Sequence, residues 1–290
     1  MQTAAAQALR VVRHDSPLGQ WSITTLTPHP FLGGAVRFIW HAAGRVAYSR
    51  DRILPGPRSY LLFNLGPPQY LIEAGPLQRR VVFNDVWYCG IAERPIDTEA
   101  PHGSDIVGVE LTPTGAALLF PWPLSELANH VSTLVDLIGH EAVALRERLL
   151  DCESTAGRLQ LVHDWLLDRC MSGRQIHPLV YWATRRLAES AGTLRTNRLA
   201  SEAGCSRKHL HALFSRDVGL APGTLARMHR FQRALAEHRS MPARTWSDVA
   251  ASCGYYDQAH LIRDFRLFAG LAPTALERLA VPDSASVVLG

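Results

Sequence analysis

Two stretches of this 290-residue chain carry polar and basic side chains at similar spacing. Arg207, Lys208 and His211 lie in the first stretch, and Gln258 and Arg263 lie in the second. An arginine guanidinium can donate two hydrogen bonds to the O6/N7 edge of guanine, and a glutamine amide pairs with the N6/N7 edge of adenine. Lysine and arginine also neutralise phosphates. These residue types therefore suit contacts with base edges and with a phosphate backbone.

The two stretches are unequal copies of one pattern, at 199–222 and 249–273. Gly204 and Gly254 are 50 positions apart, and the tetrapeptide Gly-Leu-Ala-Pro closes both copies. Each copy predicts a short helix, a turn at its glycine and a second helix, at about 206–218 in the first copy and 257–268 in the second. The pattern therefore predicts a duplicated helix-turn-helix unit.

The apolar positions of each copy predict how the polar side chains are presented. Leu210 and Phe214 in the first copy, and Leu261 and Phe265 in the second, recur at helical spacing and should face inward. A helix-turn-helix places its second helix in the major groove of DNA. A connecting helix at 222–238, ~24 Å long at ~1.5 Å per residue, would supply most of the ~34 Å between successive grooves.

The basic residues are concentrated in the half of the chain that carries the two copies. Residues 177–290 contain 15 Lys and Arg against 9 Asp and Glu, whereas the rest contains 15 against 17. This excess lies where a polyanionic partner would need it. On the connecting helix, Arg227, Arg230 and Arg233 are three residues apart, and they form either a phosphate-facing row or a solvated face.

Composition limits the other classes of protein. With 47% hydrophobic and 19% charged residues, the chain has an ordinary globular composition. No apolar run approaches the roughly 20 residues that span a bilayer, and the N-terminus has no convincing signal peptide. The five cysteines are scattered, which indicates a reducing compartment and no zinc site. We therefore expect a cytoplasmic protein.

The N-terminal half has a different pattern. Short apolar runs between Pro/Gly turns over residues 31–111 predict a small antiparallel β-barrel or sandwich, and helices follow to about residue 170. Leu159, Val162, Leu166 and Cys170 form a helical stripe that packs either on the β domain or against a second copy of the protein. The predicted fold class is therefore multidomain α+β, with an all-α C-terminal domain.

The second copy, GYYDQAHLIRDFRLFAGLAP, resembles the signature at the C-terminal end of AraC/XylS-type transcription regulators. The first copy shares its spacing and its Gly-Leu-Ala-Pro. The matching positions are Gly254, Tyr255, Asp257, Gln258, His260, Arg263, Phe265, Phe268, Gly270 and Pro273. The resemblance implies binding to double-stranded operator DNA and, as a further partner, RNA polymerase. We expect no cofactor.

The resemblance also implies which residues contact DNA. Base contacts are expected from Lys208, His211 and Ala212 in the first copy and from Gln258, Ala259 and Arg263 in the second. Since the alanines cannot donate hydrogen bonds, Arg207 or His260 would compensate, and Arg266 lies on the same outer surface. The first copy diverges more from the family pattern, so we expect the operator preference of this protein to reside in residues 207–212.

The N-terminal segment RFIWHAAGRVAYSRDRILPGPRSYLLFNLGP resembles the cupin-like effector domain of one subgroup of these regulators. That resemblance implies a small-molecule effector. Aromatic and polar residues near predicted strand positions are candidates to bind it, namely Trp40, Tyr60, Asn64, Trp87 and Tyr88. The histidines of the segment are isolated, so no metal site is expected.

Five segments result. We predict a flexible N-terminus (1–20), an effector domain (21–120), a helical linker or homodimerisation region (121–174), a DNA-binding domain (175–280) and a tail (281–290). Residues 172–175 form the predicted hinge.

Two other classes of protein compete with this one. The first is a metal- or cofactor-dependent cupin-type enzyme with an accessory helical domain, which bound iron or zinc would favour. The chain has no catalytic motif such as G-x-S-x-G, H-E-x-x-H or a P-loop. The second is a helical adaptor, which would leave the localised charge unexplained. We therefore expect no enzymatic activity.

Overall fold

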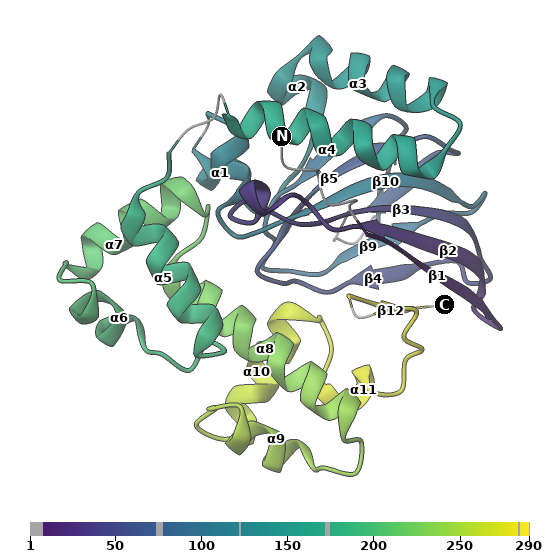
Figure 1. The fold of residues 1–290 in the computed structure, drawn as a ribbon. Coiled ribbons are helices and arrows are strands. Elements are labelled where there is room, and N and C mark those ends of the chain that lie inside the picture. The colour runs from purple at the N-terminus through teal and green to yellow at the C-terminus, as the bar shows by residue number, and fades with distance from the viewer. Residues whose placement is uncertain (1–7, 74–77, 122, 172–174, 284, 290) are drawn as a thin grey trace.

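The computed structural model describes residues 8–73, 78–121, 123–171, 175–283 and 285–289. Antiparallel β-sheets with helices on one side form the N-terminal part, and helices alone form most of the C-terminal part (Figure 1). The predicted order of β structure followed by helices is confirmed. Within these residues, no helix is both long enough and apolar enough to cross a bilayer.

Two sheets make up the β region. The seven-stranded sheet has the order β1-β2-β3-β10-β5-β8-β11, and the five-stranded sheet has the order β12-β4-β9-β6-β7. The strands are β1 (Leu9–Ser16), β2 (Gly19–Leu26), β3 (Val36–Val46), β4 (Asp51–Ile53), β5 (Ser59–Asn64), β6 (Gln69–Ile72), β7 (Arg80–Phe83), β8 (Val86–Cys89), β9 (Ile96–Glu99), β10 (Ser104–Leu111), β11 (Val131–Thr133) and β12 (Ser286–Val288).

Helices cover one face of the seven-stranded sheet and then build the C-terminal part. The helices of the N-terminal part are η1 (Pro30–Leu32), α1 (Gly115–Leu119), η2 (Leu124–Glu126), α2 (Leu134–Ile138), α3 (His140–Asp151) and α4 (Thr155–Met171). Those of the C-terminal part are α5 (Pro178–Glu189), α6 (Thr196–Glu202), α7 (Arg207–Asp217), α8 (Pro222–Ser240), α9 (Trp246–Ser252), α10 (Gln258–Phe268) and α11 (Pro273–Leu276).

The apolar stripe on α4 packs inside the chain. Leu159, Val162 and Leu166 are fully buried in one cluster with the helix-facing side of the seven-stranded sheet. Trp165 beside them lies edge-on to Phe63 of β5, with ring centroids 6.1 Å apart. The sequence allows the stripe to pack either on the β domain or against a second copy of the protein. In the structure it contacts the β region, and its buried side chains are not available to a second copy.

Both ends of the chain are more ordered than the sequence predicts. Residues 9–16, within the segment predicted to be flexible, form β1, while residues 1–7 lie outside the described part. The predicted tail contains β12, which pairs with β4 of the five-stranded sheet. Of the predicted hinge, residues 172–174 also lie outside the described part. Strand β1 pairs with its neighbour β2 in a hairpin, whereas β12 pairs with the distant strand β4, which local sequence does not reveal.

The C-terminal helices share one apolar core, and α8 runs through it. Phe231 of α8 is fully buried, with its ring centroid 4.9 Å from that of Phe265 and 5.3 Å from that of Phe268, both on α10. At ~1.5 Å per residue, the 19 residues of α8 span ~28 Å. The helix therefore joins a first unit (α6 and α7) to a second unit (α9 and α10), as predicted.

Candidate nucleic-acid interface

The first unit presents its polar residues on the outer side of α7. Gly204 has a φ of +64° in the turn before the helix, a conformation that glycine adopts without strain. The Ser206 hydroxyl accepts the backbone N–H of His209 at 3.1 Å and caps α7. Leu210 and Phe214 are fully buried. The predicted contact residues are all exposed, namely Arg207, Lys208, His211 and Ala212.

The second unit repeats this arrangement at α10. Gly254 has a φ of +76°, and the Asp257 carboxylate caps the helix by accepting the His260 N–H at 2.6 Å. Leu261 and Phe265 are fully buried. The predicted contact residues on the outer side are exposed, namely Gln258, Ala259, Arg263 and Arg266. Helices α7 and α10 therefore both present to solvent the surface that the sequence predicts.

His260 differs from the other predicted contact residues because it is half-buried. Its ring lies edge-on to the ring of Tyr255, with centroids 5.2 Å apart. Tyr256, which the sequence analysis did not single out, is 93% exposed directly before the N-cap of α10. The sequence feature that could have indicated this exposed tyrosine is the one extra residue in the turn of the second copy. The turn therefore buries one tyrosine and exposes the next.

An open groove lies beside the first unit. Its walls include Thr196 and Asn197 at the start of α6, Lys208 and His211 on α7, and Pro222 at the start of α8. The N-termini of three helices therefore meet at this groove, and each carries partial positive charge from unpaired backbone N–H groups. Arg207, which also lines the groove, donates a hydrogen bond to Asn197 Oδ1 at 3.2 Å. The groove is therefore lined by basic side chains and by helix N-termini.

The arginines of the connecting helix do not form one uniform row. Arg227 donates two hydrogen bonds, at 2.7 and 3.0 Å, to Oδ1 of Asp264 in α10, a carboxylate that is only 1% exposed. The guanidinium of Arg230 lies 5.5 Å from the ring centroid of Tyr255. Arg233 is 3.9 Å from the Glu237 carboxylate. Arg227 and Arg230 therefore both contact the second unit, which their regular spacing in the sequence does not indicate.

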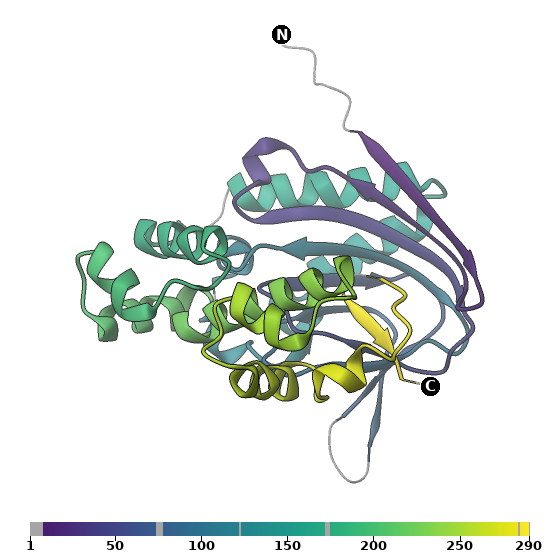
Figure 2. The same ribbon diagram turned by 90° about the horizontal axis from the view of Figure 1, so that it is seen from below.

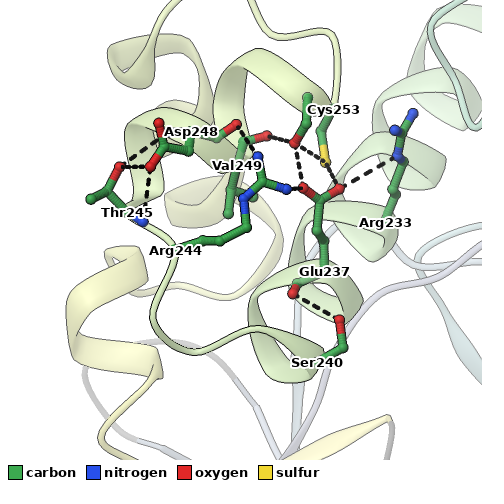
Figure 3. Close-up of polar contacts among 9 residues, drawn as sticks. Arg233, Glu237, Ser240, Arg244, Thr245, Asp248, Val249 and Cys253 are labelled. Atoms are coloured by element: carbon green, nitrogen blue, oxygen red, sulfur yellow. Dashed lines mark hydrogen bonds and ion pairs between the residues drawn. The ribbon is translucent and has the colours of Figure 1, made fainter.

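A polar network around Glu237 fixes α9 against α8 (Figure 3). Its carboxylate accepts hydrogen bonds from the Ser252 hydroxyl and the Arg244 guanidinium, and from the Cys253 thiol at 3.4 Å. Burial, with a smaller contribution from Glu237, raises the pKa of the Cys253 thiol to about 11. The thiol therefore stays protonated near neutral pH, as expected for a structural cysteine and not for a redox sensor.

The five candidate effector residues do not lie together. Tyr88 is 2% exposed on the helix-facing side, with its ring centroid 5.7 Å from that of Phe120. Asn64 is fully buried and holds a turn: its amide donates to Pro67 O at 2.9 Å. Trp40, Tyr60 and Trp87 lie on the opposite side of the sheet, and the Tyr60 hydroxyl donates to Glu110 at 3.3 Å. Strand register places Asn64 on that same side, so the structure brings four of the five to one face and leaves Tyr88 on the other.

Helix α8 also contacts the β region. The Gln232 amide donates to Pro55 O, and Nε2 of His229 is buried with no hydrogen-bond partner among the described residues. Burial, followed by the charge of Arg37, lowers the pKa of His229 to about 4. His229 is therefore neutral near pH 7, and protonating it would place an unsolvated charge between the two parts of the chain.

We expect this histidine to make folding sensitive to acid. A histidine in the unfolded chain has a pKa of about 6.5. Between this pH and about 4, the unfolded chain therefore binds a proton at His229 and the folded chain does not. Stability should therefore be full above about pH 6.5 and should fall as the pH drops towards 4. Urea unfolding at pH 7 and at pH 4.5 measures this loss, which should be smaller for His229→Gln. Equal losses for the variant and the wild type would exclude His229 as the cause.

Comparisons with known families cover both parts of the chain. Residues 199–278 match the model described as "Helix-turn-helix domain", and residues 24–133 match "Domain of unknown function (DUF6597)". No curated protein matches the sequence. The first match spans both copies of the repeat and all nine residues predicted to contact DNA.

Solved structures of ToxT are similar to the chain. ToxT from Vibrio cholerae is 12% identical, with 78% of this chain and 94% of that chain covered and a TM-score of 0.43. Unsaturated fatty acid bound ToxT from the same organism is 9% identical, with 79% of this chain and 90% of that chain covered and a TM-score of 0.43.

Among the described residues, no group of three His, Cys, Asp or Glu side chains could hold a metal ion.

Proposed function

We propose that the protein is a cytoplasmic transcription regulator of the AraC/XylS type that binds specific operator sequences in double-stranded DNA, and the match of residues 199–278 to a helix-turn-helix domain supports this. Helices α7 and α10 would enter successive major grooves. The observation that carries this proposal is the exposure of both outer surfaces, from Arg207 to Ala212 and from Gln258 to Arg266, on two capped helices joined by α8.

The basic charge of this half supports the same proposal, because phosphates must be neutralised wherever two grooves are contacted. Arg207, Lys208 and the convergent helix N-termini provide such charge beside the first unit. In the second unit, Tyr256 would contact the sugar-phosphate backbone through its ring and hydroxyl, and its 93% exposure supports this role. Regulation of a promoter would also require contact with RNA polymerase, which we place on surfaces of the chain away from the two recognition helices.

The decisive experiment is a selection of genomic DNA fragments by the purified full-length protein. We expect one sequence class to be enriched, with two half-sites about one helical turn apart. Affinity should fall steeply with salt, by about a thousandfold or more between 50 and 200 mM if six or more phosphates are contacted. No enrichment, or equal affinity for random DNA at every salt concentration, would refute the proposal.

The β region is proposed to bind a small-molecule effector on the inner side of the seven-stranded sheet. Neighbouring strand residues point to opposite faces, and the two faces differ in burial. Ile39 and Leu61, on the side covered by helices, are fully buried. Trp40 and Leu62 follow them in the chain, point towards the five-stranded sheet and are only half-buried. An incompletely buried apolar face of this kind suits a ligand.

A thermal-shift screen tests this assignment. A ligand that binds the folded chain raises its melting temperature, and Trp40→Ala should reduce that rise. A ligand that stabilises the wild type and Trp40→Ala equally would place the effector site elsewhere. The helix-turn-helix match of the C-terminal part favours a regulator over an enzyme. Catalytic turnover by the purified protein would instead support the competing enzyme hypothesis.

A further inference from the structure

The last strand of the chain belongs to the β region, although it follows the helix-turn-helix domain in sequence. Strand β12 pairs antiparallel with β4, with Val287 opposite Arg52. The pairing is extended at both ends, because Leu54 N–H donates to Ala285 O at 2.7 Å and Leu289 N–H donates to Arg50 O at 2.9 Å. Figure 2 shows β12 beside the strands of the β region, close to α8 and α10.

This strand contacts both parts of the molecule. Val287 is fully buried in the same apolar cluster as the helices of the second unit. Because side chains alternate along a strand, Ser286 and Val288 point to the other side, where Ile53 and Asp51 are their partners on β4.

The chain is fixed where it enters the strand. The Asp283 carboxylate accepts hydrogen bonds from Ala285 N at 2.6 Å, Ser286 N at 2.8 Å and the Ser286 hydroxyl at 3.0 Å. Three hydrogen bonds to one carboxylate define a single conformation for this turn. The pairing of β12 is therefore a built feature of the chain end.

Strand β4 also holds the second unit through a side chain. Arg52 donates to both oxygens of Asp97, at 2.7 and 2.8 Å, which fixes the plane of its guanidinium. Its remaining Nη1 donates to Ala269 O, the C-cap residue of α10, at 3.1 Å. One strand of the β region thus restrains the second unit by backbone pairing with β12 and by a hydrogen bond to the end of its recognition helix.

The first unit has a separate anchor. Gly219, directly after α7, lies so close to η2 that a Cβ on it would be 2.6 Å from Leu124 O. Each unit is therefore attached to a different element of the β region, the first to η2 and the second to β4 and β12. Between these two anchors, α8 connects the units through their shared core.

We propose that β12 is an intramolecular latch that holds the second unit in its docked orientation and so preorganises both units for one operator. In that orientation Gln258 and Arg263 are exposed, so docking leaves the DNA-facing surface of α10 accessible. Preorganisation favours binding because less orientational freedom is lost in the complex. The effect on DNA rests on the proposed function, whereas the latch itself does not.

Hydrogen exchange of the full-length chain tests the latch without DNA. Val287→Asp would place a charge in the buried cluster and should release β12, which speeds exchange in β4 and around Ala269 while leaving the seven-stranded sheet and α7 unchanged. Val281→Asp is the matched control, since Val281 is 44% exposed just before the strand. Unchanged exchange in β4, or the same pattern in both variants, would overturn the proposal.

A disulfide tests the same point without weakening the fold. Ile53 and Ser286 face each other in a non-hydrogen-bonded pair, because the hydrogen-bonded positions flank them at Leu54 with Ala285 and at Arg52 with Val287. Such pairs bring Cβ atoms close enough for a disulfide. Ile53→Cys combined with Ser286→Cys should slow exchange in β4 when oxidised, and reduction should reverse the effect. No change on oxidation would overturn the latch.

The DNA readout uses the operator recovered by selection. On DNA with both half-sites, Val287→Asp should bind about tenfold more weakly than wild type, whereas a single half-site for the first unit should change by less than about twofold. The oxidised double-cysteine chain should keep wild-type affinity. Tighter binding by Val287→Asp, or weaker binding by the oxidised chain, would overturn the preorganising role. If the wild type binds no DNA, the proposed function fails while hydrogen exchange still decides on the latch.

Discussion

Replacing Arg227 by alanine should lower the free energy of unfolding by about 3 kcal/mol, near the lower end for breaking a buried ion pair. The reason is Asp264, whose carboxylate is 1% exposed and receives two hydrogen bonds from this guanidinium. Without Arg227 the carboxylate remains buried and loses its cation. The lower end applies because the Arg227 side chain is itself 37% exposed, so water can partly replace it. Urea unfolding followed by circular dichroism measures the loss.

Arg233→Ala is the matched control on the same helix. Arg233 is 40% exposed and lies 3.9 Å from Glu237, so its removal should cost less than about 1 kcal/mol. DNA binding separates the two roles further. Loss of a phosphate contact reduces the salt dependence by about one unit of slope, whereas Arg227→Ala should leave the slope unchanged in molecules that remain folded. An unchanged stability with a reduced slope would return Arg227 to the phosphate-contact role.

The parts of the fold that local sequence could predict are those with local causes. Ser206 and Asp257 cap their helices through backbone N–H groups three residues away, and the two glycine turns need only their own φ angles. The spacing of Leu210 and Phe214 then determines which side of α7 is outward. These features depend on neighbours within one or two helical turns, so the recognition helices and their exposed residues could be predicted without a structure.

Other features depend on contacts between distant segments. Arg52 donates to Ala269 O, 217 positions along the chain, and no local pattern indicates that pairing. Arg227 lies at regular spacing from Arg230 and Arg233, yet a single buried carboxylate on another helix determines its role. In the β region, strand register decides that Tyr60 faces inward while Tyr88 faces the helices. The sequence predicts aromatic residues near strands but not which face each one occupies.

These contacts separate the arginines of the C-terminal part into two groups. Arg227 and Arg230 contact the second unit, so their charge serves the internal structure. Arg263 and Arg266 are exposed on the outer side of α10, together with Gln258. Charge counting treats all of them alike, but only the exposed group is positioned to reach a base edge. Arg263 therefore carries the sharpest prediction about sequence recognition.

Arg263→Ala should weaken operator binding by 1–3 kcal/mol, or about 5- to 150-fold, if its guanidinium donates two hydrogen bonds to one base. A guanidinium fork recognises guanine by geometry and not by charge alone. Arg263→Lys should therefore lose most of the discrimination while it keeps the salt dependence of the wild type. Competition binding to the selected operator, to operators with single base changes and to random DNA measures both quantities.

The control is Tyr256→Ala, seven residues earlier in the turn before α10, where the side chain is 93% exposed. Tyr256 is uncharged and is proposed to contact the sugar-phosphate backbone. Its removal should therefore weaken binding to operator and to random DNA to the same extent and should leave the salt dependence of binding unchanged. Arg263→Ala should instead reduce the difference in affinity between operator and random DNA. The loss of base discrimination should be largest at one base pair. Equal weakening on both DNAs, with a salt slope reduced by about one, would make Arg263 a phosphate contact. Sequence reading by the second unit would then depend on Gln258 alone among its exposed donors at the start of α10.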